Sequence, residues 1–261
     1  MSYKIVFLDI DGTILPPDHI IVESTKSAVK QLQEKGVIVC IATGRPTIDT
    51  VKVAEEIGVN SYITFNGACV TIEDKVIYKE LLATEDVEQL LSTAKANDHD
   101  VLLASTEKNV IIPAPNSTKA TEYVQHLHMH GSLYNTEEDK KEVLSGTVLL
   151  QNHNEATVYD EIPSIHLVPC NIGGFIAYDF ISPNINKATA IDKVLKHLNI
   201  DQADTIAFGD GMNDKEMLSY VKVGIAMGNA HEDLQKFASF TTTPVTEDGI
   251  YNGLKILGLV D

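Results

Sequence analysis

The sequence of 261 residues lacks tryptophan and contains only one arginine and three cysteines. The cysteines, Cys40, Cys69 and Cys170, are widely spaced and form no CxxC pair, which argues against a disulfide framework or a thiolate metal site. No uninterrupted apolar stretch approaches the length of a membrane span, and the first residues lack the charge pattern and cleavage site of a signal peptide. We therefore expect a cytoplasmic globular protein.

Basic residues are also scarce. The chain has 20 Lys plus Arg against 37 Asp plus Glu, which gives a formal net charge of -17. This excess opposes nonspecific binding to nucleic acid or to an anionic membrane surface, so we expect neither as a partner. The single arginine, Arg45, offers a planar fork that suits bidentate contact with phosphate or carboxylate. Arg45 is therefore a candidate binding residue for an anion.

Two acidic motifs each follow an apolar run, at distant places in the chain. Asp9 and Asp11 come directly after the run at residues 5–8, and Gly12 then allows a sharp turn of the backbone. Asp210 and Asp214 follow a second run near the other end. Because parallel strands of an open α/β sheet present their carboxyl ends along one edge, these carboxylates can converge on one metal ion.

The order of apolar runs and helix-like segments indicates two architectures. Near-continuous apolar strands separated by helices predict a parallel sheet covered on both faces in the N-terminal part, and this pattern returns after Pro183. The middle of the chain instead has clustered strands with two or three helices, which is typical of an α+β layer. We predict a core domain of residues 1–82 and 184–261 and an inserted cap domain of residues 83–183. The expected helices of most consequence lie at 23–34, 47–57, 84–96, 117–130 and 187–198.

Four pieces in this order, residues 9–13, 43–46, Lys187 and 209–214, closely resemble the motifs of the haloacid dehalogenase-like (HAD) superfamily. Together with residues 65–67 they resemble its Cof-type branch, subfamily IIB. The resemblance implies an α/β fold, with a Rossmann-like parallel-sheet HAD core and an inserted α+β cap of the C2 type. One departure is Ala188 after Lys187, where many relatives have glycine.

The resemblance implies an Mg²⁺-dependent phosphatase that forms an aspartyl-phosphate. Asp9 is then the nucleophile, and Asp11 is the general acid toward the leaving alkoxide and later the general base toward water. Thr43 and Lys187 complete the expected catalytic set.

The expected Mg²⁺ ligands are Asp9, the backbone carbonyl of Asp11, and Asp210. Asp214 could bind the metal directly or orient a water or Lys187, and we favour the orienting role. The residues expected to bind phosphate or substrate are Gly44, Arg45, Asn66 and Asn213.

Small phosphorylated metabolites are the expected substrates, with sugar phosphates first and phosphorylated cofactors such as pyridoxal or flavin phosphates second. Cap segments should decide between them. A phosphosugar mutase or phosphotransferase on the same scaffold is the first alternative. A noncatalytic metabolite sensor is the second, although a sensor would not need both Asp9 and Asp11. We expect a monomer or a weak homodimer.

Three histidines at alternate positions, His126, His128 and His130, could suggest a second metal site. The i, i+4 spacing of His126 and His130 would allow a shared ligand on a helix. No third ligand is evident, and we favour the surface end of a helix.

Overall fold

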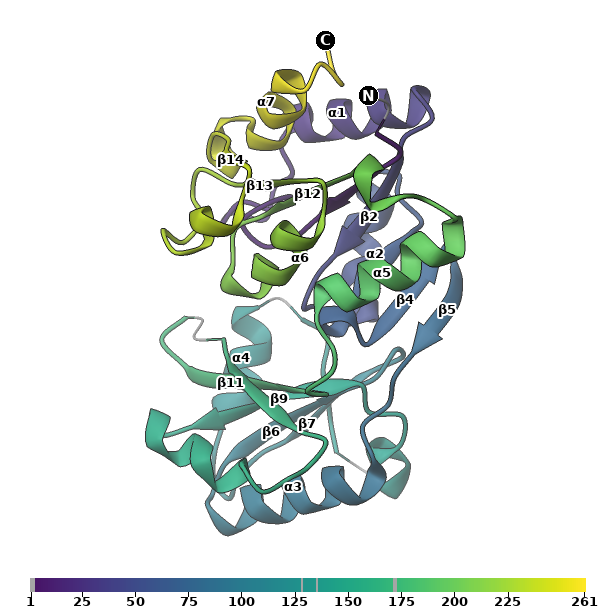
Figure 1. Ribbon diagram of the computed structural model, residues 1–261. Helices are drawn as coiled ribbons and strands as arrows, with labels where there is room; N and C mark the ends of the chain where they lie inside the picture. Colours follow the sequence, from purple (N-terminus) through teal and green to yellow (C-terminus); the bar gives the residue numbers. More distant parts are fainter. Residues whose placement is uncertain (1–2, 128, 135, 171–172) are drawn as a thin grey trace. The chain divides into compact units, whose positions relative to one another are not determined.

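The computed structural model describes residues 3–127, 129–134, 136–170 and 173–261 (Figure 1). The chain divides into two compact units. The first unit comprises Met1–Arg45, Thr50–Tyr78 and Asn186–Asp261, and the second comprises Pro46–Asp49 and Lys79–Ile185. Among the described residues, no helix combines the length and the hydropathy needed to cross a membrane.

A sheet of eight strands, counted over the described residues, forms the centre of the first unit, in the order β14-β13-β12-β1-β2-β3-β4-β5. Strand β1 lies between β12 and β2 and pairs with both in parallel. The strands are β1 (Ile5–Leu8), β2 (Ile38–Ala42), β3 (Tyr62–Thr64), β4 (Cys69–Ile72), β5 (Lys75–Lys79), β12 (Thr205–Gly209), β13 (Val223–Ala226) and β14 (Phe240–Thr241).

Strand β1 is apolar throughout because both of its faces are covered. Val6 and Leu8 pack into one hydrophobic cluster, and Ile5 and Phe7 pack into another. Alternate side chains of a strand point to opposite faces, so a strand buried on both sides reads as a continuous apolar run. This explains why the strand was visible in the sequence.

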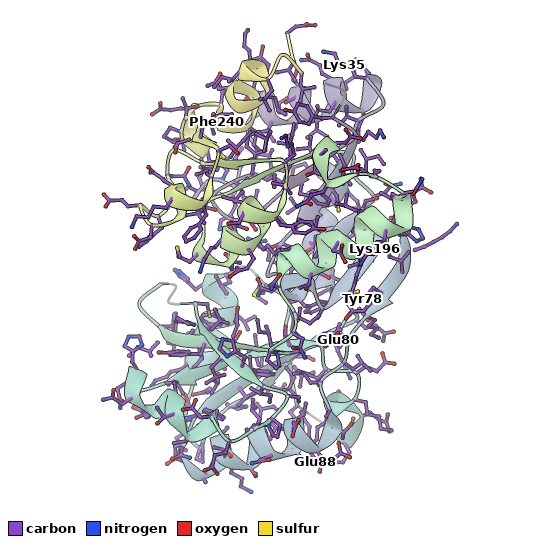
Figure 2. All side chains as sticks on the ribbon, viewed as in Figure 1. Lys35, Tyr78, Glu80, Glu88, Lys196 and Phe240 are labelled. Atoms are coloured by element: carbon purple, nitrogen blue, oxygen red, sulfur yellow. The ribbon has the colours of Figure 1, made fainter. Side chains whose placement is uncertain are left out.

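Helices cover both faces of this sheet, and the side chains between them fill the layers (Figure 2). The first cluster includes buried residues of α1, α2 and α7, and the second includes those of α5 and α6. These helices are α1 (Glu23–Glu34), α2 (Thr47–Glu56), α5 (Lys187–Leu198), α6 (Lys215–Tyr220) and α7 (Gly249–Ile256). The predicted parallel sheet with helices on both faces is confirmed.

The second unit has a sheet of six strands over the described residues, in the order β10-β11-β9-β6-β7-β8. Helix α3 packs in one hydrophobic cluster with Val101 and Leu103, whereas α4 packs in another with Leu102, so the two helices lie on opposite faces. The predicted α+β architecture is confirmed. The elements are α3 (Thr84–Ala96), β6 (Asp100–Ala104), β7 (Asn109–Ile112), α4 (Lys119–His126), β8 (Ser132–Leu133), β9 (Ser145–Leu150), β10 (His166–Pro169) and β11 (Ile176–Ile181).

Helix α4 is shorter than the expected 117–130. The hydroxyl of Ser117 donates to Asp100 at 2.8 Å and accepts from the backbone N–H of Lys119 at 3.2 Å, so the chain before Lys119 forms a turn. The helix ends at His126. The other expected helices were closer: α1, α3 and α5 have the predicted bounds, and α2 ends one residue early, at Glu56. The domain boundaries at 83 and 183 stay predictions.

Candidate active site

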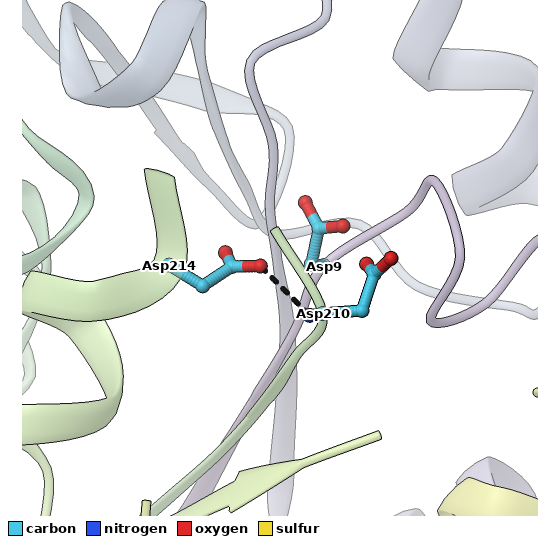
Figure 3. Close-up of side chains that lie close together, drawn as sticks. All are labelled: Asp9, Asp210 and Asp214. Carbon is cyan, nitrogen blue, oxygen red and sulfur yellow. Dashed lines mark hydrogen bonds between the residues drawn. The ribbon is translucent and has the colours of Figure 1, made fainter. Parts of the chain in front are cut away.

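The carboxylates of three aspartates meet where two central strands end. Asp9 directly follows β1 and Asp210 directly follows β12, and these neighbouring parallel strands pair Leu8 with Phe208. Asp214 is the third member. One oxygen from each carboxylate lies within 4.8 Å of the others (Figure 3). The sheet edge therefore brings together acids that are about 200 residues apart in sequence, as the motifs predicted.

Lys187, the first residue of α5, is fully buried between two of these acids. Its Nζ donates to Oδ1 of Asp9 at 2.6 Å and to Oδ1 of Asp214 at 2.6 Å. A buried ammonium is tolerated only when it is paired and hydrogen-bonded, and both conditions hold here. The helix start is fixed by Asn186, whose side-chain oxygen accepts from the backbone N–H of Thr189 at 2.9 Å.

Asp214 is fully buried and uses both carboxylate oxygens within the protein. Oδ1 accepts from Lys187, and Oδ2 accepts from the backbone N–H groups of Asp210 at 3.0 Å and Gly211 at 3.1 Å. Figure 3 shows the hydrogen bond from Asp210. A Cβ at Gly209 would lie 2.5 Å from Cγ of Asp214, so only glycine allows this close approach. Asp214 therefore ties the loop after β12 to Lys187.

The carboxylate of Asp210 is held from two sides. The hydroxyl of Thr13 donates to Oδ1 at 3.2 Å, and Nδ2 of Asn229 lies 3.4 Å from Oδ2. Gly12 makes room for this carboxylate: its φ is +77°, and a Cβ there would lie 2.1 Å from Oδ2 of Asp210. The loop after β1 thus contacts Asp210, in the loop after β12, through the side chain of Thr13 and beside the backbone of Gly12.

The crowding of acids shifts the pKa of several groups. Burial raises the pKa of Asp9 well above its usual range; Lys187 opposes this, and the charges of the other aspartates add to it. Burial and the charge of Asp214 raise the pKa of Asp210 to about 7. Burial lowers the pKa of Lys187, but Asp214 and Asp9 outweigh it, and the net shift is upward. The cluster thus holds more carboxylates than its lysine can neutralise, and its donors are all oxygen. Such a set fits a hard divalent cation.

Asp11 points its carboxylate at Arg45 instead of joining this cluster. Nε of Arg45 donates to Oδ2 at 2.8 Å and Nη2 donates to Oδ1 at 2.5 Å. The side chain of Asp11 is 57% exposed and that of Arg45 is 15% exposed. The buried hydroxyl of Thr43 accepts from the backbone N–H of Arg45 at 3.1 Å and so shapes the same loop.

The remaining predicted phosphate-binding residues also lie together. Nδ2 of Asn213 donates to Oδ1 of Asn66 at 3.1 Å, across 147 residues of sequence. Asn66 has a φ of +54°, and a Cβ at Gly44 would lie 3.1 Å from its amide nitrogen. Gly44 lies three residues before α2, which begins at Thr47 as expected.

Two residues of this site received no role from the sequence: Thr13, which lies in the motif at residues 9–13, and Asn229. Asn229 lies three residues beyond β13, whereas Asp9 and Asp210 directly follow their strands, so the strand-end signal did not mark it. His126 and His130 have other partners within the second unit. His126 packs its ring near Phe175, with ring centroids 6.2 Å apart, and Nδ1 of His130 lies 3.0 Å from Asp49. His128 lies outside the described residues.

A family model of the haloacid dehalogenase-like hydrolases matches residues 6–254. The chain belongs to this family. The Bacillus subtilis (strain 168) protein named "Putative phosphatase YkrA" is 37% identical over the full length of both chains. The B. subtilis 5-amino-6-(5-phospho-D-ribitylamino)uracil phosphatase YcsE is 26% identical, with 98% of this chain and 96% of that protein covered.

Solved structures agree with the fold. The HAD subclass IIB sugar phosphatase BT4131 superposes with a TM-score of 0.86 at 30% identity, covering 98% of this chain and all of that one. The predicted fold class, a Rossmann-like HAD core with an inserted cap, is confirmed. The protein is a Cof-type HAD phosphatase, an enzyme that hydrolyses phosphoric monoesters.

Proposed function

We propose that the enzyme is an Mg²⁺-dependent phosphatase that hydrolyses small phosphorylated metabolites through an aspartyl-phosphate. The observation that carries this proposal is the buried bridge of Lys187 between Asp9 and Asp214, beside Asp210, at the carboxyl edge of the sheet. A nucleophile, a cation and a set of oxygen donors lie together there, which is what phosphoryl transfer to a carboxylate needs.

The metal would be held by the carboxylates of Asp9 and Asp210 and by the backbone carbonyl of Asp11. Asp214 is better placed to orient Lys187, because both of its oxygens already accept hydrogen bonds within the protein. When bound, Mg²⁺ supplies positive charge for the phosphate oxygens and offsets the charge of the acidic cluster.

In the first half-reaction, a carboxylate oxygen of Asp9 forms a bond to phosphorus as the bond from phosphorus to the ester oxygen breaks. Asp11 gives its proton to that departing oxygen, so the alcohol leaves neutral. In the second half-reaction, Asp11 takes a proton from water as the water oxygen attacks phosphorus. The bond to Asp9 breaks, which restores the carboxylate and releases inorganic phosphate. Lys187 and the hydroxyl of Thr43 stabilise charge on the transferring group.

Arg45, the backbone of Gly44, Asn66 and Asn213 are the proposed contacts to phosphate or to the rest of the substrate. Support comes from their placement, since Asn66 approaches both Gly44 and Asn213. In a chain of net charge -17, an anionic substrate depends on such local groups. Arg45 is paired with Asp11 in this structure, so phosphate must compete with that carboxylate for the guanidinium.

The proposed substrates are sugar phosphates or phosphorylated cofactors. The similar proteins support this range: BT4131 is a sugar phosphatase, and YcsE acts on a uracil that carries a phosphoribitylamino group. We also propose a cytoplasmic location, which the free thiols of Cys40 and Cys69 support.

The test is phosphate release from a panel of sugar phosphates and phosphorylated cofactors, with Mg²⁺ and with chelator. Wild type is compared with Asp9→Asn, and a thermal melt establishes that the variant is folded. We expect release that requires Mg²⁺ and is abolished in the variant. Release that persists in Asp9→Asn would rule out the aspartyl-phosphate. An isomerised phosphosugar in place of free phosphate would instead identify a mutase, and binding without any turnover would identify a sensor.

A further inference from the structure

Asn229 joins three segments of the first unit through one side chain. Its Nδ2 donates to the backbone carbonyl of Gly12 at 2.8 Å and lies 3.4 Å from Oδ2 of Asp210. Its Oδ1 accepts from the backbone N–H of Val245 at 2.8 Å. The three partners belong to the loops after β1 and β12 and to the first residue of a short 3-10 helix, Val245–Glu247.

We propose that Asn229 is a positioning residue that orients the carboxylate of Asp210 to bind the metal. This inference rests on the proposed function, in which Asp210 is a metal ligand. An amide group carries two N–H donors, and the positions of Gly12 and Asp210 allow one donor for each. Asn229 thereby fixes the distance between the loop after β1, which carries Gly12, and the loop after β12, which carries Asp210. Its own Oδ1 is held by Val245.

The chemistry of the amide suits this task. A lysine in the same place would cancel the negative charge that attracts a cation, whereas a neutral N–H donor orients the carboxylate and leaves its charge in place. The opposite oxygen of Asp210 accepts from Thr13, so the two neutral donors define the plane of the carboxylate. Gly12 leaves room for this carboxylate, because a side chain there would collide with Oδ2 of Asp210.

Asn252 provides a matched control within the same unit. Its Nδ2 donates to the hydroxyl of Thr243 at 2.9 Å and to the backbone carbonyl of Glu247 at 3.0 Å, so it also ties loop segments together. Neither partner belongs to the acidic cluster. Asn252→Ala therefore measures how Mg²⁺ affinity changes on loss of an asparagine that holds loops together but does not contact the proposed metal site.

The experiment measures the dissociation constant of Mg²⁺ by titration calorimetry, without substrate, for wild type, Asn229→Ala and Asn252→Ala. Loss of a group that orients a metal ligand weakens metal binding by about 10- to 100-fold. We expect a weakening of this size for Asn229→Ala and a change of less than about twofold for Asn252→Ala. If Asn229→Ala does not fold, Asn229→Ser takes its place, with the same expected direction.

Thr13→Val supplies a second, independent comparison. If Thr13 and Asn229 orient the same carboxylate, the double variant will lose less Mg²⁺ affinity than the product of the two single losses predicts. Equal Mg²⁺ binding by wild type and Asn229→Ala, or equal weakening by Asn252→Ala, would overturn the inference, as would a wild type that binds no Mg²⁺. If wild type binds Mg²⁺ in an Asn229-dependent way but releases no phosphate, the inference stands and the proposed function fails.

Discussion

The carboxylate of Asp11 and the guanidinium of Arg45 form a two-point ion pair, with Nε 2.8 Å from Oδ2 and Nη2 2.5 Å from Oδ1. Arg45 is the only arginine in the chain. The proposed general acid and the proposed phosphate-binding cation are therefore partners before substrate arrives. In the proposed function, phosphate gains Arg45 as Asp11 releases it, and the same exchange frees Asp11 to act as an acid.

Asp11→Asn separates these two effects. Loss of the acid should lower kcat by about 10²- to 10⁴-fold, the usual contribution of general acid–base catalysis. Loss of its charge should at the same time tighten the binding of inorganic phosphate by up to about fivefold, since an exposed ion pair contributes up to about 1 kcal/mol. Steady-state kinetics and calorimetric titration with phosphate, both with Mg²⁺, measure the two quantities.

Asp192→Asn is the control for net charge, because Asp192 is paired with Lys196 on the surface of α5. It removes the same charge from the chain and should change neither quantity. Phosphate binding that is weakened or unchanged in Asp11→Asn would show that Arg45 does not have to leave Asp11.

Lys187→Met should abolish phosphatase activity and also destabilise the first unit. It leaves the carboxylates of Asp9 and Asp214 without their shared cation, and removal of one partner from a buried ion pair costs about 3–5 kcal/mol. Urea unfolding at pH 8 with chelator measures the change in the free energy of unfolding.

Lys196→Met on the same helix is the control. Lys196 is exposed, and its pair with Asp192 is of the i, i+4 kind (Figure 2). Such pairs contribute about 0.3–0.5 kcal/mol. A loss in Lys187→Met as small as that in Lys196→Met would mean that the buried bridge is not a main source of stability.

Asp210→Asn should stabilise the metal-free protein at alkaline pH. Burial raises the pKa of Asp210 to about 7, whereas its ordinary value is 3.8. The folded state therefore keeps a proton that the unfolded state has lost, and wild-type stability falls as pH rises from about 4 through 7. The neutral amide avoids this penalty.

The Tm of Asp210→Asn, measured with chelator, should exceed that of wild type at pH 8, and the difference should shrink as pH falls toward 4. Saturating Mg²⁺ should raise the Tm of wild type more than that of the variant, because the ligand is lost. A variant that melts below wild type at pH 8 without metal contradicts the prediction.

His99 should make the second unit sensitive to acid. It is buried, with Nδ1 2.8 Å from the hydroxyl of Tyr159 and Nε2 3.1 Å from Glu155. Burial lowers its pKa, although the charge of Glu155 opposes this. The unfolded chain then takes up a proton below about pH 6.5 that the folded chain does not, so stability falls with pH.

The comparison is the free energy of unfolding at pH 7.5 and pH 5.5 for wild type, His99→Gln and His166→Gln. His166 lies on β10 and is exposed, so its variant should follow wild type. The loss of free energy of unfolding between the two pH values should be smaller in His99→Gln than in wild type by about 1 kcal/mol, close to the energy of a one-unit pKa difference. Parallel curves for all three proteins would exclude His99 as the source of acid sensitivity.

The sequence allowed prediction of those parts of the site that depend on strand ends. Strands β1 and β12 are apolar on both faces, so their ends, and with them Asp9 and Asp210, were visible. Lys187 was found only through the order of motifs, because a lone lysine at a helix start is usually exposed. The ion pair of Asp11 with Arg45 could not be predicted, since spacing does not say which way a side chain turns.

Elements that depend on tertiary packing were missed. Helix α7 contains two glycines, which weaken a helix, and it was not expected from the sequence. In the structure Ile250 and Leu254 are buried in the same cluster as residues of α1, and this burial stabilises the helix. Asn229 was missed for a related reason, since its three partners come from loops that only the folded sheet brings together.

Strand β1 takes one neighbour from nearby in the chain and the other from about 200 residues away, since Ile5 pairs with Ile38 on one side and with Thr205 on the other. Pairing at such separation is slow, and during synthesis it must wait for the later residues to emerge. A growing chain therefore carries Asp9 through most of translation without Lys187, Asp210 or Asp214. In the proposed mechanism, catalysis requires β12 beside β1, and we expect nascent chains that stop short of β12 to carry the proposed nucleophile without turning over phosphate esters.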